Sequence, residues 1–234
     1  MKLPFFSRKE KKVQKRYYQG AQVGRLLGGM FGSSASADST IKPSLGRLRD
    51  RARDLERNNE YVARALDLME IGVVGDRGFN LQVKGANLDG RLDIPANDLI
   101  ERRWKQWGKY ATTDGCMSFR DVCAMAIRVL KRDGEFFCQI VNNSAYPDGI
   151  ALHPIEADRV DVDKNELMPS GRRIRMGVEL DEFERPVAYW VLNYHPGDYD
   201  FMQNRPEKKH TRIPAEKIIH VFKKKRPGQT RGES

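Results

Sequence analysis

Residues 181–192 of this 234-residue chain read DEFERPVAYWVL, and this stretch decides the fold class. Positions 187–192 are all apolar or aromatic, so both faces of a strand formed there can be buried. The charged residues 182–185 favour a turn, and Pro186 can open the next strand, where a missing N–H is tolerated. The sequence therefore predicts a β-hairpin that belongs to an antiparallel sheet.

The chain after this strand continues as an alternation of turns and strands. HPGD at 195–198 indicates a turn, a polar loop follows, and IIHVF at 218–222 predicts the last strand. Because a residue that precedes proline is pushed out of the helical region, Pro214 and Pro227 bracket that strand. RPGQTRG at 226–232 then predicts a tight basic turn.

The part of the chain that precedes the strands is predicted to be helical. Within 45–73 apolar residues recur every three or four positions, which is the spacing of an amphipathic helix. Asn58 and Asn59 interrupt this pattern, and asparagine favours helix caps and turns. Two helices are therefore expected, at about 45–57 and 60–72, with the arginines of the first on its solvated face.

The middle of the chain supplies the remaining elements of the predicted domain. Ser118 and Asp121 have the spacing of a capping box that opens a helix. Trp104 and Trp107 lie in another predicted helix and are expected to be core or interface anchors. The elements expected here are a strand at 79–83, a helix at 96–109, and strands at 136–141, about 150–155 and 173–180. Helices followed by a mostly antiparallel sheet define an α+β fold.

The net charge of +10 is unevenly distributed along the chain. Residues 1–25 carry eight Lys or Arg and one Glu, and residues 203–234 carry ten against three Glu, so each end has a net charge of +7. The body between them must then carry −4. A mildly acidic body does not fit a protein that grips nucleic acid over a continuous basic face. The basic ends leave a basic-tailed DNA-binding module open as an alternative.

Residues 1–44 differ in composition from the rest of the chain. They pass from a dense charge run into a segment rich in glycine, serine and alanine. Such a composition buries little apolar area, so we expect a flexible basic and Gly/Ser-rich arm. Residues 45–234 are then expected to form one α+β domain.

The sequence also indicates the cellular compartment of the protein. No apolar run approaches the roughly 20 residues that cross a membrane, and the N-terminus lacks the features of a signal peptide. The cysteines Cys116, Cys123 and Cys138 have no CxxC spacing, so they are expected to be reduced and mostly buried. We therefore expect an intracellular protein.

The search for catalytic and metal-binding motifs yields one weak candidate. Asp161, Asp163 and Asn165 match the opening of a calcium loop, but Glu166 and Arg172 depart from its later positions. Asp158, Asp161 and Asp163 leave a metal-dependent nuclease open as an alternative. The chain has no HExxH, Gly-x-Ser-x-Gly or Walker motif, so no catalytic, metal-binding or cofactor-binding residue is expected. His220, between two apolar residues of a strand, is expected to be a hydrogen-bonded core or interface residue.

A series of short motifs, in a fixed order, resembles one known family. The motifs are RDLERNNEY at 53–61, VVG at 73–75, the paired tryptophans, DGE at 133–135, IEADR at 155–159, and the stretches from 185 to 232 quoted above. This series is similar to that of the portal proteins of lambda-like tailed bacteriophages, over about residues 45–232. Glu60 departs from the family, in which proline is common at this point.

The resemblance implies a structural role. Portal proteins share a fold with an α+β wing and assemble into a ring, usually dodecameric, at one capsid vertex. DNA is packaged and ejected through that ring, which later joins the head to the tail. The implied partners are further copies of the chain, the terminase large subunit, the major capsid protein, head–tail connector proteins and double-stranded DNA. The implied location is the virion, with the host cytoplasm during assembly and no membrane contact, and no enzymatic activity is implied.

The resemblance also points to particular residues and to the extent of the chain. The family-motif residues, which are candidates for an interface, are Trp104, Trp107, Tyr189, Trp190, His220, Arg226, Pro227, Gly228, Gln229, Arg231 and Gly232. Family members continue well beyond the RPGQ turn into stem, clip and crown regions. This sequence is therefore expected to represent a truncated, N-terminal and chiefly wing-like portion of a portal subunit.

Overall fold

A computed structural model of the chain describes residue 25 and residues 34–198 and 209–234. Contacts within the chain separate Met1–Ala35 from a compact unit, Ser36–Ser234. The account below concerns the compact unit. Most of the predicted arm, 1–44, lies outside the described residues.

The first helix, α1 (Ala37–Asn58), begins earlier than the predicted 45. The side chain of Ser36 accepts a hydrogen bond from the N–H of Ser39 and so caps the helix. Buried Ile41 and Leu45 give the first turns a packing face, although Pro43 lies inside the helix and has no N–H to donate to the Ser39 carbonyl. The glycine- and serine-rich composition before 45 concealed this start.

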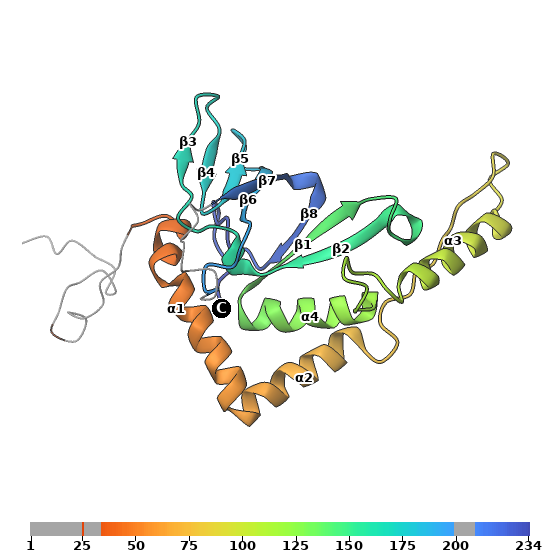
Figure 1. Cartoon of the computed structure of the whole chain (residues 1–234), viewed down its shortest axis with the longest axis horizontal. Coiled ribbons are helices and arrows are strands. Elements are labelled where there is room, and N and C mark those ends of the chain that lie inside the picture. Colours follow the sequence, from red (N-terminus) through yellow and green to blue (C-terminus); the bar gives the residue numbers. More distant parts are fainter. Residues whose placement is uncertain (1–24, 26–33, 199–208) are drawn as a thin grey trace, which may run out of the picture. The chain divides into compact units, whose positions relative to one another are not determined.

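The second helix, α2 (Glu60–Val74), follows at a sharp corner (Figure 1). The side chain of Asn59 accepts hydrogen bonds from the N–H groups of Tyr61 and Val62, at 3.0 and 3.2 Å. The predicted meeting of two helices at Asn58 and Asn59 is thus confirmed.

The predicted strand at 79–83 is wrong. This segment forms no strand, and the N–H of its last residue is bound by a side chain of α3 (Ile94–Trp107). The N–H of Val83 donates to Glu101 Oε1 at 2.9 Å, and Asn97 both accepts from and donates to the backbone of Gly85. Side chains of α3 thus bind the backbone at Val83 and Gly85, and no strand pairs with residues 79–83.

The fourth helix, α4 (Phe119–Arg132), confirms the predicted capping box. The Ser118 side chain accepts from the N–H of Asp121, and the Asp121 carboxylate accepts from the N–H of Ser118. Two N-terminal donors of the helix are satisfied in this reciprocal way.

Two antiparallel sheets follow the helices, as the predicted α+β class requires. The first has the order β2-β1-β8, with β1 at Glu135–Asn142, β2 at Ile150–Ile155 and β8 at Ile218–Phe222. The second has the order β3-β4-β5-β6-β7, with bounds Glu166–Leu167, Arg173–Arg175, Val178–Leu180, Pro186–Leu192 and His210–Pro214. Short 3₁₀ turns lie at Pro147–Gly149, Ala157–Arg159 and Ala215–Lys217.

The predicted strand at 173–180 is instead a hairpin of β4 and β5. Met176 and Gly177 have φ values of 45° and 80°, the left-handed values that a tight hairpin turn requires. A Cβ on Gly177 would lie 2.9 Å from the carbonyl oxygen of Asp161, so the close approach of two backbones also favours glycine here.

The first sheet has a hydrophobic cluster on each face. On one face Phe136 and Cys138 of β1 pack with Val122 of α4 and with Trp107. On the other face Phe137 packs among residues of the second sheet, Val178, Leu180, Tyr189, Val191 and Ile213. Figure 1 shows α4 running beneath β1 and β2. No helix among the described residues is both long enough and apolar enough to span a bilayer.

Candidate functional site

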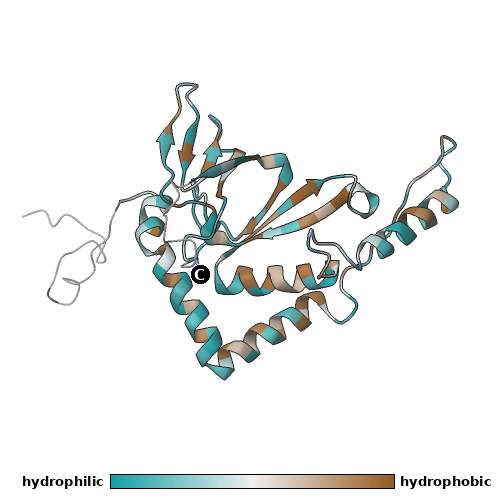
Figure 2. Ribbon diagram, viewed as in Figure 1, coloured by the Kyte–Doolittle hydropathy of each residue, from teal (hydrophilic) through white to brown (hydrophobic). Residues whose placement is uncertain are grey.

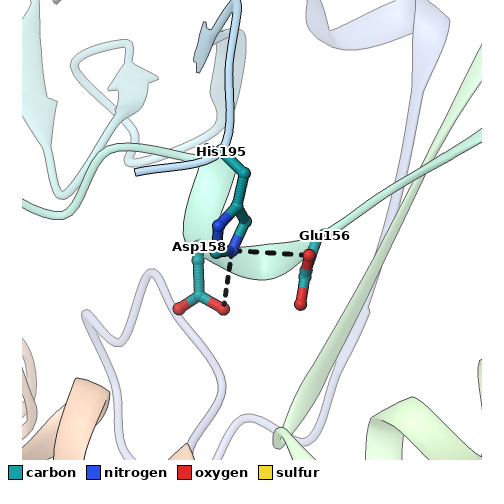
Figure 3. Close-up of side chains that lie close together, drawn as sticks. All are labelled: Glu156, Asp158 and His195. Atoms are coloured by element: carbon teal, nitrogen blue, oxygen red, sulfur yellow. Dashed lines mark ion pairs between the residues drawn. The ribbon is translucent and has the colours of Figure 1, made fainter. Parts of the chain in front are cut away.

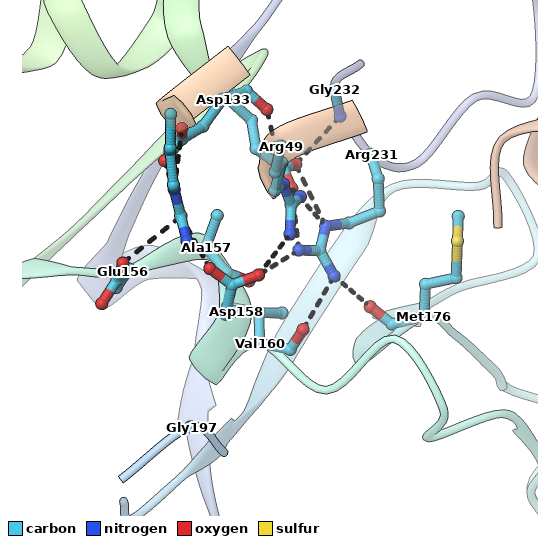
Figure 4. Close-up of polar contacts among 12 residues, drawn as sticks. Arg49, Asp133, Glu156, Ala157, Asp158, Val160, Met176, Gly197, Arg231 and Gly232 are labelled. Atoms are coloured by element: carbon cyan, nitrogen blue, oxygen red, sulfur yellow. Dashed lines mark hydrogen bonds and ion pairs between the residues drawn. The ribbon is translucent and has the colours of Figure 1, made fainter. Parts of the chain in front are cut away.

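The predicted basic turn inserts an arginine into the interior of the domain. Arg231 is fully buried, and its guanidinium donates to three carbonyl oxygens (Figure 4). These belong to Val160 at 3.0 Å, Met176 at 2.7 Å and Ala157 at 3.0 Å. The residues lie in the 3₁₀ turn after β2 and in the β4–β5 turn, so one side chain ties the two sheets together.

The counter-charge of Arg231 is Glu135, the first residue of β1, which is also fully buried. Arg231 Nη2 lies 2.7 Å from Glu135 Oε1, and the Gly232 N–H donates to Glu135 Oε2 at 2.9 Å. Arg49 of α1 reaches the same carboxylate, and His220 Nε2 lies 3.0 Å from it. We call Arg49, Glu135, His220 and Arg231 the buried charge cluster.

The electrostatics of the cluster keep Glu135 ionised. Burial by itself would raise its pKa, but Arg231, the His220 hydrogen bond and Arg49 outweigh burial and hold the pKa of Glu135 well below its usual range. Burial lowers the pKa of His220 in spite of its carboxylate partner, which favours the neutral ring. Burial likewise raises the pKa of Tyr189, whose hydroxyl lies 3.3 Å from His220 Nδ1, to about 12.

Gln229 holds the turn that delivers Arg231. Its side-chain oxygen accepts from the N–H groups of Lys225 and Arg226, and its amide nitrogen donates to the Arg231 carbonyl at 2.8 Å. Gly228 has φ of 72°, a left-handed value that suits glycine. The Gln229 side chain therefore sets the shape of the RPGQTRG segment.

The same segment is fastened to the first helix. The N–H and hydroxyl of Thr230 both donate to the carboxylate of Asp38, each at 2.9 Å. Asp38 lies in the first turn of α1, and Thr230 and Asp38 are both buried. Segments 192 positions apart in the sequence are thereby joined.

Two glycines allow the last residues to cross the start of β1. A Cβ on Gly134 would lie 2.2 Å from the carbonyl carbon of Glu233, and a Cβ on Gly232 would lie 2.1 Å from the Gly134 oxygen. Real Cβ atoms do not approach this closely, so neither position accepts a side chain without a backbone shift.

A second set of ion pairs anchors the helices beside this cluster. Arg53 Nη2 lies 2.8 Å from Asp133 and 2.6 Å from Asp158, and Arg132 Nε lies 2.7 Å from Asp133. Arg128 of α4 binds carboxylates of α1 and α2, namely Glu56, Asp67 and Glu70. The expectation that the α1 arginines form a solvated face is wrong for Arg49 and Arg53, because α4 and β1 place carboxylates against them.

Among the described residues, one group has the composition and spacing of a metal site, namely Glu156, Asp158 and His195 (Figure 3). His195 Nε2 lies 3.4 Å from Glu156 and 3.9 Å from Asp158. Arg53 Nη2 already lies 2.6 Å from Asp158 and 3.3 Å from Glu156. A guanidinium in this place supplies the positive charge that a metal would bring, so the group fits an ion-pair network better than a metal site.

The nuclease alternative required Asp158, Asp161 and Asp163 to act together. Asp161 is buried, accepts from the Asp163 N–H at 2.9 Å and lies 2.8 Å from His210 Nε2. Asp158 instead faces Arg49 and Arg53. The structure therefore does not gather these three carboxylates around one point.

The residues predicted to form an interface do not lie together in the fold. His220, Tyr189, Gln229, Arg231 and Gly232 belong to the buried charge cluster or its immediate surroundings.

The tryptophans lie elsewhere. The rings of Trp104 and Trp107 are 4.9 Å apart beside Phe119, and Trp107 donates to the Ile150 carbonyl. Trp190 lies under the ammonium of Lys164, 5.1 Å from its ring centre. Arg226 and Pro227 are exposed, next to Gly228 in the turn.

Sequence reasoning missed Arg49, Glu135 and Asp38 as parts of this site. One signal was present, because Arg49 follows Ile41 and Leu45 at four-residue spacing and so lies on the buried face of α1. Glu135 opens a strand whose next three residues, Phe136, Phe137 and Cys138, are buried and apolar, which marks a charge that needs an internal partner. The sequence did not show which arginine supplies that partner.

Comparison with known proteins places this architecture in a family. The profile described as "Phage portal protein, lambda family" matches residues 23–234. The chain is 36% identical over 221 residues to the "Probable portal protein" of Halomonas phage phiHAP-1. The matched region covers 93% of this chain and 42% of that protein. It is 26% identical over 229 residues to "Portal protein B" of Escherichia phage lambda, covering 91% of this chain and 41% of that protein.

Two facts follow from these matches. The chain spans less than half the length of the curated relatives that it matches. The family profile nevertheless covers all of the described residues. The chain therefore belongs to the lambda family of phage portal proteins.

Proposed function

We propose that the chain is part of a structural portal subunit, which forms a ring at the capsid vertex with further copies of itself. DNA would be packaged and ejected through the ring, and the tail would join there. The observation that carries this proposal is the family match over residues 23–234, together with relatives that are themselves described as portal proteins. The proposal places the protein in the virion.

The buried charge cluster supports a structural role. Glu135 and Arg231 are fully buried and are satisfied by each other, by backbone carbonyls and by Arg49 and His220. These polar groups fix the relative placement of α1, β1 and the 229–232 segment. A rigid framework of this kind suits a subunit that must hold its shape while DNA moves past.

The finer features of the proposal come from the family resemblance. They are a ring that is usually dodecameric, and contacts with the terminase large subunit, the major capsid protein, head–tail connector proteins and double-stranded DNA. We propose no catalytic residue and no cofactor.

A chimera tests the proposal. Residues 23–234 would replace the matched portion of the Halomonas phage phiHAP-1 protein, and the product would be made together with the capsid and terminase proteins of that phage. We expect rings by electron microscopy and DNA-filled capsids, as for the unmodified protein. A chimera that is folded by circular dichroism yet stays monomeric beside the capsid protein would overturn the proposal. Magnesium-dependent cleavage of DNA by the purified chain, lost on Asp161→Ala, would favour the nuclease alternative instead.

A further inference from the structure

Exposed apolar side chains are concentrated in one continuous part of the chain. Of the twenty exposed large apolar residues among those that the structure describes, fifteen lie between positions 48 and 110. They are Leu48, Leu55, Tyr61, Leu68, Met69, Ile71, Val73, Phe79, Leu81, Leu88, Leu92, Ile94, Leu99, Ile100 and Tyr110. Single exposed apolar residues are ordinary, whereas exposed apolar residues that gather on one face of the molecule mark an interaction surface.

Helix α2 contributes one side of this surface. Leu66 and Val74 are buried in the domain, whereas Tyr61, Leu68 and Ile71 are 89%, 53% and 57% exposed. Figure 2 shows apolar positions along the whole helix. Because apolar residues lie on the outer face of α2 as well as on its buried side, that outer face lacks a partner within the described residues.

The outer face of α2 also has room for close packing. A Cβ placed on Gly72 would meet no atom within 4 Å, and Ala65 is exposed one turn from Leu68. Small residues of this kind let another element approach a helix closely. We call Tyr61, Ala65, Leu68, Ile71 and Gly72 the α2 outer face.

The segment 77–110, which we call the α3 arm, supplies a second and different apolar surface. Leu99 and Ile100 of α3 are 49% and 48% exposed. A groove of about 270 Å³ runs beside them, lined chiefly by Leu81, Ile100, Trp104, Trp107 and Ile150. Figure 1 shows α3 extending away from the first sheet, against which its last residue, Trp107, packs. The α3 arm therefore also presents apolar surface without a partner among the described residues.

The charges of the two surfaces are opposite. Residues 60–76 carry four carboxylates and one arginine, but Asp67 and Glu70 are bound by Arg128 of α4; the other charged residues, Glu60, Arg64 and Asp76, sum to −1. Residues 77–110 carry seven Lys or Arg and four carboxylates, a net charge of +3, and Asp148, which pairs with Arg103 at 3.4 Å, reduces this to +2. Complementary charge around two apolar faces favours their association and fixes its direction.

We propose that the α2 outer face of one copy of this chain packs against the α3 arm of the next copy. The inference rests on the proposed ring, and it identifies the surfaces that join its subunits. A contact between two different surfaces is heterologous, and heterologous contacts close into rings when the rotation per subunit permits. Two unlike, complementary apolar faces on one chain are what such an assembly requires.

Charged substitutions on each face test the inference. Leu68→Glu and Leu99→Glu would be introduced singly into the phiHAP-1 chimera described above, with Leu167→Glu as the matched control. Leu167 is 74% exposed on β3, outside both surfaces. We expect each interface variant to raise the protein concentration needed for half-maximal ring formation, measured by native mass spectrometry, by at least about tenfold. The control should assemble like the unmodified chimera, and circular dichroism should show all three folded.

A cross-link shows directly whether the two surfaces meet. Leu68→Cys and Leu99→Cys would be combined in a Cys116→Ser background, because Cys116 is the exposed native cysteine. A short bismaleimide should then join copies into a ladder of oligomers, and neither single-cysteine variant should form that ladder beyond a dimer. A double-cysteine ring that yields no ladder would overturn the assignment.

The outcomes separate this inference from the proposed function. If both glutamate variants form rings like the control, the surface assignment is wrong while the ring remains. If only Leu68→Glu weakens assembly, the α3 arm is not the partner, and the inference is overturned. If the unmodified chimera forms no ring beside its capsid protein, the proposed function itself fails.

Discussion

Residues 229–232 and residues 48–110 differ in which kind of side chain they bury and which they expose. At 229–232 the chain brings an arginine into the interior, where Arg231 and Glu135 are both fully buried. Between 48 and 110 it leaves apolar side chains such as Tyr61 and Leu88 in solvent. One region hides charge and the other exposes hydrophobic surface.

The difference indicates where each region finds its partners. Buried charges are tolerated only when paired, and the buried charge cluster obtains all its pairing from within the chain. Exposed apolar surface is removed from water only by another molecule. The residues that stabilise the fold and those that we propose to join subunits are therefore different, and each set can be changed without the other.

The largest effect is expected at Arg231. Arg231→Met would leave Glu135 short of a counter-charge and would leave three carbonyl oxygens without donors. Removing one partner of a buried pair costs about 3–5 kcal/mol, so we expect a loss of that size in the free energy of unfolding. Urea denaturation of the 234-residue chain measures it.

The matched control is Arg47→Met, the same change at an exposed arginine of α1. It should alter stability by no more than about 0.5 kcal/mol. Similar losses for the two variants would show that the cluster does not hold the fold together.

The next effect concerns the close crossing at Gly134. Gly134→Ala would introduce a methyl group into the backbone of Glu233, in addition to the strain of a left-handed φ of 85°. We expect a loss of about 3 kcal/mol, from about 1–2 kcal/mol of strain and a similar cost of overpacking.

Gly90→Ala separates the two causes. Gly90 has nearly the same φ, 81°, but a Cβ there would meet no atom within 4 Å. This variant should therefore lose about 1 kcal/mol, from strain alone. If thermal or urea unfolding gives equal losses for the two variants, the last residues do not pack against Gly134 as described.

A pH effect is expected from His220. Its folded-state pKa lies below the usual 6.5, so as pH falls the unfolded chain takes up the proton first. The contribution of His220 to the free energy of unfolding is complete above about pH 6.5. It declines as the pH falls toward the folded-state pKa, with a slope of at most about 1.4 kcal/mol per pH unit. The pKa of Glu135 is also lowered, and its contribution is lost only below 4.5.

His220→Gln should therefore flatten the dependence of unfolding free energy on pH between about 6.5 and 5. Burial also lowers the pKa of His153, so a smaller slope of the same sign should remain in the variant. An unchanged slope in His220→Gln would show that this imidazole is not buried in the neutral form.

Local sequence patterns predicted the local structure well. The meeting of two helices at Asn59, the capping box at Ser118 and the strand after Pro186 each depend on residues within a few positions of one another. Periodicity and capping chemistry act over that range. The strand expected at 79–83 does not form, and the backbone at Val83 and Gly85 is bound by side chains of a later helix.

The buried charge cluster could not be predicted in the same way. Arg49 and Arg231 meet Glu135 from 86 and 96 positions away along the chain. Nothing near Glu135 in sequence identifies either partner, and a basic turn at 226–232 is equally compatible with exposure. The order of family motifs marked Arg231 and Gly232 as notable, but their role as an internal anchor emerged only from the fold.

The smallest effect on stability is expected at Leu68, on the outer face of α2. Leu68→Glu removes apolar surface that the isolated chain leaves in water, since Leu68 is 53% exposed, and glutamate is nearly as good a helix former as leucine. We expect the free energy of unfolding of the 234-residue chain, measured at a concentration where it is monomeric, to change by less than about 0.5 kcal/mol. Leu66→Ala, two positions away on the buried face of the same helix, should instead cost about 2–5 kcal/mol. If Leu68→Glu destabilises the monomer as strongly as Leu66→Ala, the outer face of α2 is covered within a single chain, and it cannot serve as a surface reserved for a second copy.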